Sequence, residues 1–291
     1  MDADSFGFNP DRFAISCGNC TILYHLQDLT RRFLFHADAC AYGGRIVRPR
    51  HVVILSEASS SIGVSGGRAE SRVKGRHFKP FVKTGPAATI VEAGFDDVRA
   101  ARALTLGEGR EEGLRSTSSA KAVVEGVEVG GRLSVRQLSA LLQASSIPGQ
   151  DEPSIVIGSA TSARGVVIDG APLTVEFDVA AFGRVPTYSQ FMEAGQPGCL
   201  HDKPATAGPR KPVLTTIVKS LRWSKKPPAT ARIEGHTVKV DDFGRIFFGE
   251  MLVDFGSRRL TVMRLRLGSP EGGMVDFADV QTNGSWYPPI L

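Results

Sequence analysis

Three stretches of the chain have the pattern of a β-hairpin, and this pattern most limits the folds open to it. In residues 127–135, 166–175 and 231–240, apolar and polar residues alternate on both sides of a short turn that contains glycine. A period of two places apolar side chains on one face of a strand, and glycine adopts the backbone of a tight turn without strain. We therefore expect antiparallel sheets over much of the chain.

Helical spacing appears in three other places. Apolar residues recur at steps of three and four within Thr21–His36, and residues 95–106 are similar. Ser134 has capping-box spacing ahead of an apolar stripe that reaches Leu142. The predicted fold class is α+β and rich in β, with predominantly antiparallel sheets in a sandwich or barrel-like arrangement and two or three helices.

The polar, glycine-rich stretch from Gly107 to Ser119 is the best candidate for a linker. It separates a mixed α/β region, residues 1–115, from a mainly antiparallel β region, residues 120–291. In the second region, Phe-Gly-Arg followed by an aliphatic residue comes after two of the hairpins, at Phe182 and at Phe243. That spacing suggests a hairpin repeat of about 60 residues.

Composition excludes several classes of protein. Of the 291 residues, 42% are hydrophobic and 22% are charged, which argues against a disordered or collagen-like chain. The sequence contains no run of 18 apolar residues, so it predicts no membrane-spanning helix. Its N-terminal residues lack the basic start and apolar core of a secretory signal. Four cysteines are too few for a disulfide scaffold, so we expect a cytoplasmic protein.

Charge is unevenly distributed along the chain. Lysine and arginine number 35 against 30 acidic residues, and fourteen of the basic residues but only five acidic ones lie between Lys203 and Arg266. We expect a basic face made by one strand and a preceding loop: Arg258, Arg259, Arg264, Arg266, Lys225 and Lys226. Such a face favours a non-catalytic binding or assembly protein with an acidic macromolecule or protein as partner, and homo-oligomers remain open. The alternative is that these side chains only solvate strand surfaces.

A second hypothesis rests on the motif Cys17-Gly18-Asn19-Cys20. At the start of the predicted helix, the helix dipole would lower the pKa of the first thiol, and the second cysteine would resolve a mixed disulfide. The motif resembles the active-site turn of the thioredoxin family. That family also has a cis-proline opposite the dithiol, and residues 184–187 (Arg-Val-Pro-Thr) are locally similar. The resemblance implies a thiol-disulfide oxidoreductase with Cys17 and Cys20 as catalytic residues.

The same cysteines, with His36 and Cys40, also have a spacing that superficially suits zinc. The predicted helix of sixteen residues would hold the two pairs about 24 Å apart. We therefore predict no metal site.

A third hypothesis is a serine hydrolase. Residues 63–67 match G-x-S-x-G with Ser65 at the centre, and His236 with Asp202 would complete a triad in the required order. The chain has no phosphate loop and no dinucleotide-binding glycine motif, so no cofactor is predicted.

Overall fold

The computed structural model describes residues 33–48, 51–97, 114–147, 150–200, 211–268 and 272–286. It also describes the backbone of an N-terminal antiparallel hairpin, β1 (Arg12–Cys17) and β2 (Cys20–His25). Within these residues, no helix is long and apolar enough to cross a membrane.

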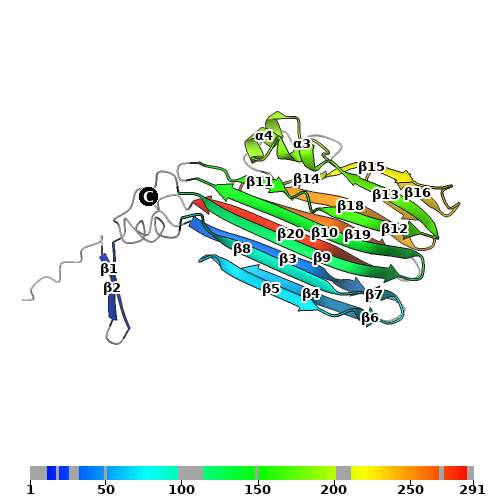
Figure 1. Ribbon diagram of the computed structural model, residues 1–291, viewed down its shortest axis with the longest axis horizontal. Coiled ribbons are helices and arrows are strands. Elements are labelled where there is room, and N and C mark those ends of the chain that lie inside the picture. Colours follow the sequence, from blue (N-terminus) through cyan, green and yellow to red (C-terminus); the bar gives the residue numbers. More distant parts are fainter. Residues whose placement is uncertain are drawn as a thin grey trace, which may run out of the picture.

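The remaining strands form two antiparallel sheets (Figure 1). The eight-stranded sheet has the order β16 (Ala231–Glu234), β17 (Thr237–Val240), β18 (Gly244–Val253), β19 (Ser257–Leu267), β20 (Gly273–Trp286), β3 (Phe33–Ile46) and β4 (Val52–Ile62), with β14 (Val213–Thr216) paired to β18. The ten-stranded sheet has the order β15 (Val218–Trp223), β13 (Ala171–Phe177), β12 (Ser162–Ile168), β10 (Leu133–Ser146), β9 (Ser116–Val129), β7 (Val82–Thr84) and β6 (Arg76–Phe78). In this sheet β11 (Ser154–Ile157) pairs with β10, and β8 (Ala87–Phe95) joins β9 to β5 (Gly67–Val73).

The two sheets pack face to face, with β3 and β20 of one lying against β8, β9 and β10 of the other (Figure 1). Side chains such as Leu138, Phe248 and Phe277 are fully buried between them. The predicted β-rich sandwich is therefore confirmed, and the described strands do not close into a barrel. All three predicted hairpins are present, as β9–β10, β12–β13 and β16–β17.

The structure contains two short helices in its described part, and both lie where none was predicted. Asp178 caps α3 (Val179–Gly183) by accepting a hydrogen bond from the Ala181 N–H. Thr187 and Gln190 form a capping box at the start of α4 (Tyr188–Glu193). The two helices lie at one long side of the sandwich, near β11 and β14 (Figure 1).

The predicted helices are wrong wherever the structure tests them. Residues of Thr21–His36 lie in β2 and β3, and residues 134–142 lie inside β10, while residues 98–106 fall outside the described part of the chain. The physical reason in β10 is a kink at Arg136. Inward residues step by two from Leu133 to Val135, then by three to Leu138, and this step imitates helical spacing.

The kinks line up across each sheet. In the eight-stranded sheet, Gly249, Val262, Ala278, Ala41 and Ala58 lie opposite one another on five adjacent strands, where the regular pairing skips one residue. Three of the five have positive φ, including the two non-glycine residues Ala58 (45°) and Ala278 (52°). The kink reverses which side chains face the core on its two sides.

Both of the regions expected from the sequence contribute strands to both sheets. In each sheet the strands of the expected N-terminal region lie together at one side and join those of the C-terminal region, through β3 paired with β20 and β8 paired with β9. The two Phe-Gly-Arg segments are also unlike in structure. The one at Phe182 ends α3, whereas the one at Phe243 leads into β18.

Candidate functional site

Arg258 does not lie on the expected basic face. Its residue is 1% exposed, and one guanidinium nitrogen, Nη2, donates to the Val185 carbonyl at 2.5 Å and to the Thr187 carbonyl at 3.5 Å. The other, Nη1, has no hydrogen-bond partner. Burial lowers the pKa of Arg258 to about 10. This side chain therefore holds the connection between α3 and α4 against β19 and is closed to a partner.

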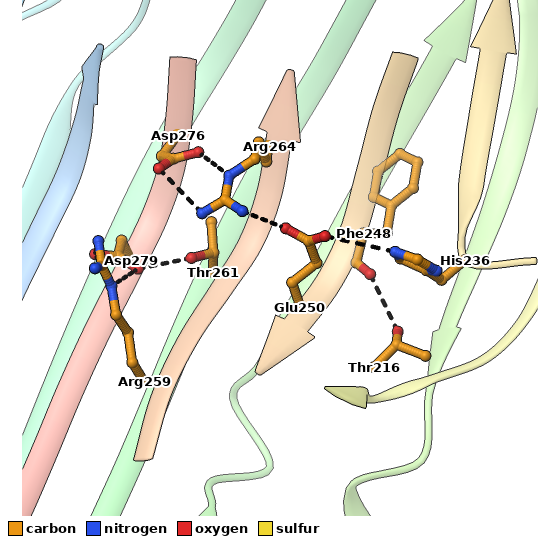
Figure 2. Close-up of polar contacts among 9 residues, drawn as sticks. All are labelled: Thr216, His236, Phe248, Glu250, Arg259, Thr261, Arg264, Asp276 and Asp279. Atoms are coloured by element: carbon orange, nitrogen blue, oxygen red, sulfur yellow. Dashed lines mark hydrogen bonds and ion pairs between the residues drawn. The ribbon is translucent and has the colours of Figure 1, made fainter. Parts of the chain in front are cut away.

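Arg259 and Arg264 do face outward, but neighbouring acids neutralise both (Figure 2). Arg259 makes a bidentate contact with Asp279, with distances of 2.8–3.1 Å. Arg264 donates to Asp276 and to Glu250, each at 2.7 Å. These two arginines belong to a polar network on the outer surface of the sheet, and their charges are not available as the sequence predicted.

The network continues from Glu250 to His236 (Figure 2), where Nε2 and Oε1 are 3.6 Å apart. A histidine beside a carboxylate is the arrangement of a general base with its orienting group. The described side-chain contacts of His236 are Glu250 and the ring of Phe247, and neither supplies a hydroxyl or a thiol. Among these described contacts, the pair has no hydroxyl or thiol of the kind that a histidine base activates.

Arg266 is exposed and, unlike Arg259 and Arg264, has no acidic partner among the described ion pairs; it lies in a basic row that the sequence analysis missed. The register places Lys239, Arg245, Arg266, Met274 and Arg45 directly opposite one another across five adjacent strands. Three like charges thus stand side by side, and a fourth lies one strand beyond Met274. We call Lys239, Arg245, Arg266 and Arg45 the basic row.

Few acids compensate the basic row. Among the described ion pairs, Arg245 has a partner, Glu234 at 2.9 Å, while the other three members have none. A surface hollow of about 660 Å³ lies over the Lys239 end and is lined by Lys239, Arg245 and Arg266 together with Phe247, Asp241 and Asp242. The acids therefore gather at one end, and the end at Arg266 and Arg45 is left more strongly positive.

Lys225 and Lys226 lie on an exposed loop between β15 and β16, where the chain passes from one sheet to the other. The strand register does not place them in the basic row. Their part in binding stays a prediction.

The thiol hypothesis loses its physical premise. Cys17 ends β1 and Cys20 begins β2, so a strand stands where a helix N-terminus was expected. The side chains of both cysteines are outside the described part of the structure, and their catalytic role stays a prediction. The resemblance to thioredoxins implies a cis peptide bond before Pro186. In the described part of the structure, the cis bond is instead the one between Lys79 and Pro80.

The zinc and hydrolase spacings also meet a different geometry. His36 and Cys40 are four residues apart on β3, about 13 Å in an extended strand, which is too far for one ion. The structure holds no metal-binding group of histidine, cysteine and acidic residues in its described part.

Ser65 lies in an exposed turn between β4 and β5, with a strand rather than a helix after it. His236 precedes β17, which is five strands from β4 in the same sheet, or about 24 Å. The structure therefore does not bring Ser65 and His236 together, and Asp202 is outside its described part.

Comparison with known proteins gives one match. A family model described as "Domain of unknown function (DUF8256)" matches residues 33–198, more than half of the chain. No curated protein and no solved structure matches the chain.

Proposed function

We propose that this chain, which belongs to the DUF8256 family of unknown function, is a non-catalytic binding protein whose basic row holds an acidic macromolecule. The observation that carries the proposal is the register of Lys239, Arg245, Arg266 and Arg45 on one outer surface. The family match contributes no ligand. It covers Arg45 but not the other three residues.

The basic row is unfavourable for the isolated protein. Like charges directly opposite each other on neighbouring strands destabilise a sheet, and the row has two such contacts, Lys239 with Arg245 and Arg245 with Arg266. Glu234 offsets part of this repulsion through Arg245. An anionic ligand that lies along the row would remove the rest, which is the physical support for a binding role.

The dimensions suit an extended polyanion. Strands are spaced about 4.8 Å apart, so the row from Lys239 to Arg45 is about 19 Å long. Asp241 and Asp242 repel anions at the Lys239 end. We therefore expect the strongest contacts from Arg266 and Arg45, which lie on either side of the half-exposed Met274.

The test is salt elution from immobilised heparin, used as an acidic polymer. The variant Arg45→Gln/Arg266→Gln should elute at lower salt than the wild type, because each lost phosphate-like contact removes about one unit from the slope of log affinity against log salt. The matched control is Lys121→Gln/Arg164→Gln, which removes the same charge from the outer surface of the ten-stranded sheet. Equal effects of the two double variants, or retention that does not depend on salt, would contradict the proposal.

A further inference from the structure

The geometry points to an interaction surface of a different kind: β4, at the edge of the eight-stranded sheet, pairs antiparallel with β4 of a second copy of this chain. This inference does not depend on the basic row. It starts from the hydrogen bonds that an edge strand leaves open. The described backbone hydrogen bonds of β4 run to β3, and no other described backbone group bonds to its free edge.

The other long or accessible edges of the sandwich carry charges that discourage pairing, as edge strands of natural proteins usually do. The edge strand β5 carries Arg68, Glu70 and Arg72, which pair among themselves and with Glu92. At the opposite edges, β15 carries Lys219 and Arg222, and β16 has only four residues, including Arg232 and Glu234.

The edge formed by β4 lacks such protection. Over its eleven residues it has one charged side chain, Glu57, which is 19% exposed and lies near Arg76 of β6. Two large apolar side chains point outward instead, Val53 at 54% exposed and Leu55 at 72%. An exposed edge whose outward side chains carry no charge is a template for another strand.

The register identifies the second strand as another β4. The register of β4 with β3 shifts between Tyr42 and Gly44, opposite Leu55 and Ser56, so the regular segment available for pairing is Val52–Leu55. An antiparallel pair centred on Ile54 sets Val53 opposite Leu55 of the second copy, and the two-fold axis repeats this contact. Aliphatic cross-strand pairs of this kind stabilise a sheet.

The same register is complementary elsewhere along the strand. Ile54, buried on the inner side, meets its own copy there and extends the core across the axis. Glu57 lies opposite the buried Tyr42 of β3 and near Arg76 of the other sheet, so the one charged residue of the strand faces inward and puts no acid on the outer face of the proposed pair. None of the charged edges offers β4 an equally apolar partner, and a two-fold pair satisfies both free edges at once.

The test is the solution mass of the full chain by light scattering across a wide range of concentration. We expect a dimer, twice 31.2 kDa, and a monomer for Leu55→Lys at concentrations where the wild type is dimeric. The matched control is Leu252→Lys, an outward leucine that is 40% exposed on the interior strand β18 of the same sheet. This control should stay dimeric.

A cross-linking experiment tests the register. The double variant Val53→Cys/Leu55→Cys should form a covalent dimer on oxidation, because residues 53 and 55 of the two copies are opposite each other. Val53→Cys alone should not, because its copies lie diagonally, about 8 Å apart, beyond the reach of a disulfide. A monomeric wild type, a dimer unaffected by Leu55→Lys, or equal cross-linking of the single and double variants would overturn the inference.

Discussion

Arg264 is the residue on which the outer polar network depends, and its replacement by methionine gives the sharpest test of the structure. Its guanidinium bridges two carboxylates, Asp276 and Glu250 (Figure 2). The Glu250 side chain is 9% exposed and that of Asp276 is 21% exposed. The change Arg264→Met keeps the aliphatic stem and removes the charge.

The expected loss follows from these burial values. Removing one partner of a buried ion pair leaves an uncompensated charge and costs about 3–5 kcal/mol. Glu250 is buried enough for this value. Its other partner, His236, is 3.6 Å away and would not replace the lost contact with Arg264. We therefore expect Arg264→Met to lower the free energy of unfolding by about 3–4 kcal/mol, with Asp276 adding less because it is more exposed.

The assay is urea unfolding followed by circular dichroism, with Arg259→Met as the control. Arg259 makes an equally good bidentate contact with Asp279, but its side chain is 48% exposed, so its loss should cost about 1 kcal/mol or less. Adding Glu250→Gln to Arg264→Met should restore part of the stability, because the stranded charge is gone. A loss from Arg264→Met no larger than that from Arg259→Met would refute the argument from burial.

Two further predictions concern stability. The pKa of Asp169 is lowered, chiefly by hydrogen bonds from Arg132, so its carboxylate stabilises the fold at neutral pH and this contribution is lost as pH falls through the folded pKa. In urea unfolding, Asp169→Asn should lower the free energy of unfolding by about 1–2 kcal/mol at pH 7 and differ less from the wild type at pH 3. Gly249 has a φ of +58°, and an added Cβ would lie 2.7 Å from a side-chain atom of Ile217, so Gly249→Ala should cost about 2–4 kcal/mol in the same assay. Gly195→Ala, also at positive φ but with open space around it, should cost only about 1–2 kcal/mol, and equal losses at the two sites would contradict the steric argument.

Local pattern was enough to predict the hairpins, because each one joins neighbouring segments through a glycine turn. It failed where a kink interrupts the alternation. On an ideal strand, Arg258, Arg264 and Arg266 would share one surface, since all three have even numbers. The kink at Val262 reverses the pattern, so Arg259 joins Arg264 outside and Arg258 is buried. No property of the single strand marks Val262 as the point of reversal, because the kink belongs to a line of residues across five strands.

The basic row was beyond sequence reasoning for a related reason. Arg45 reaches the row because β3 pairs with β20, more than 200 residues away in the chain. The high local density of basic residues in the C-terminal part predicted a basic face there. It could not distinguish Arg266, which is exposed, from Arg264, which Asp276 and Glu250 neutralise.

The two proposals meet at β4, and together they lead to one more measurable consequence. Arg45 lies opposite Val53 on β3, next to the proposed dimer edge, so pairing of two β4 strands would place the two copies of Arg45 three strand spacings apart and two residues out of line, about 16 Å. The two basic rows would then share one continuous outer surface and could hold the same polymer, which multiplies the affinity. Leu55→Lys should consequently weaken retention on heparin although it adds a positive charge, because it separates the two rows. If retention instead increases in proportion to the added charge, each copy binds through its own row alone.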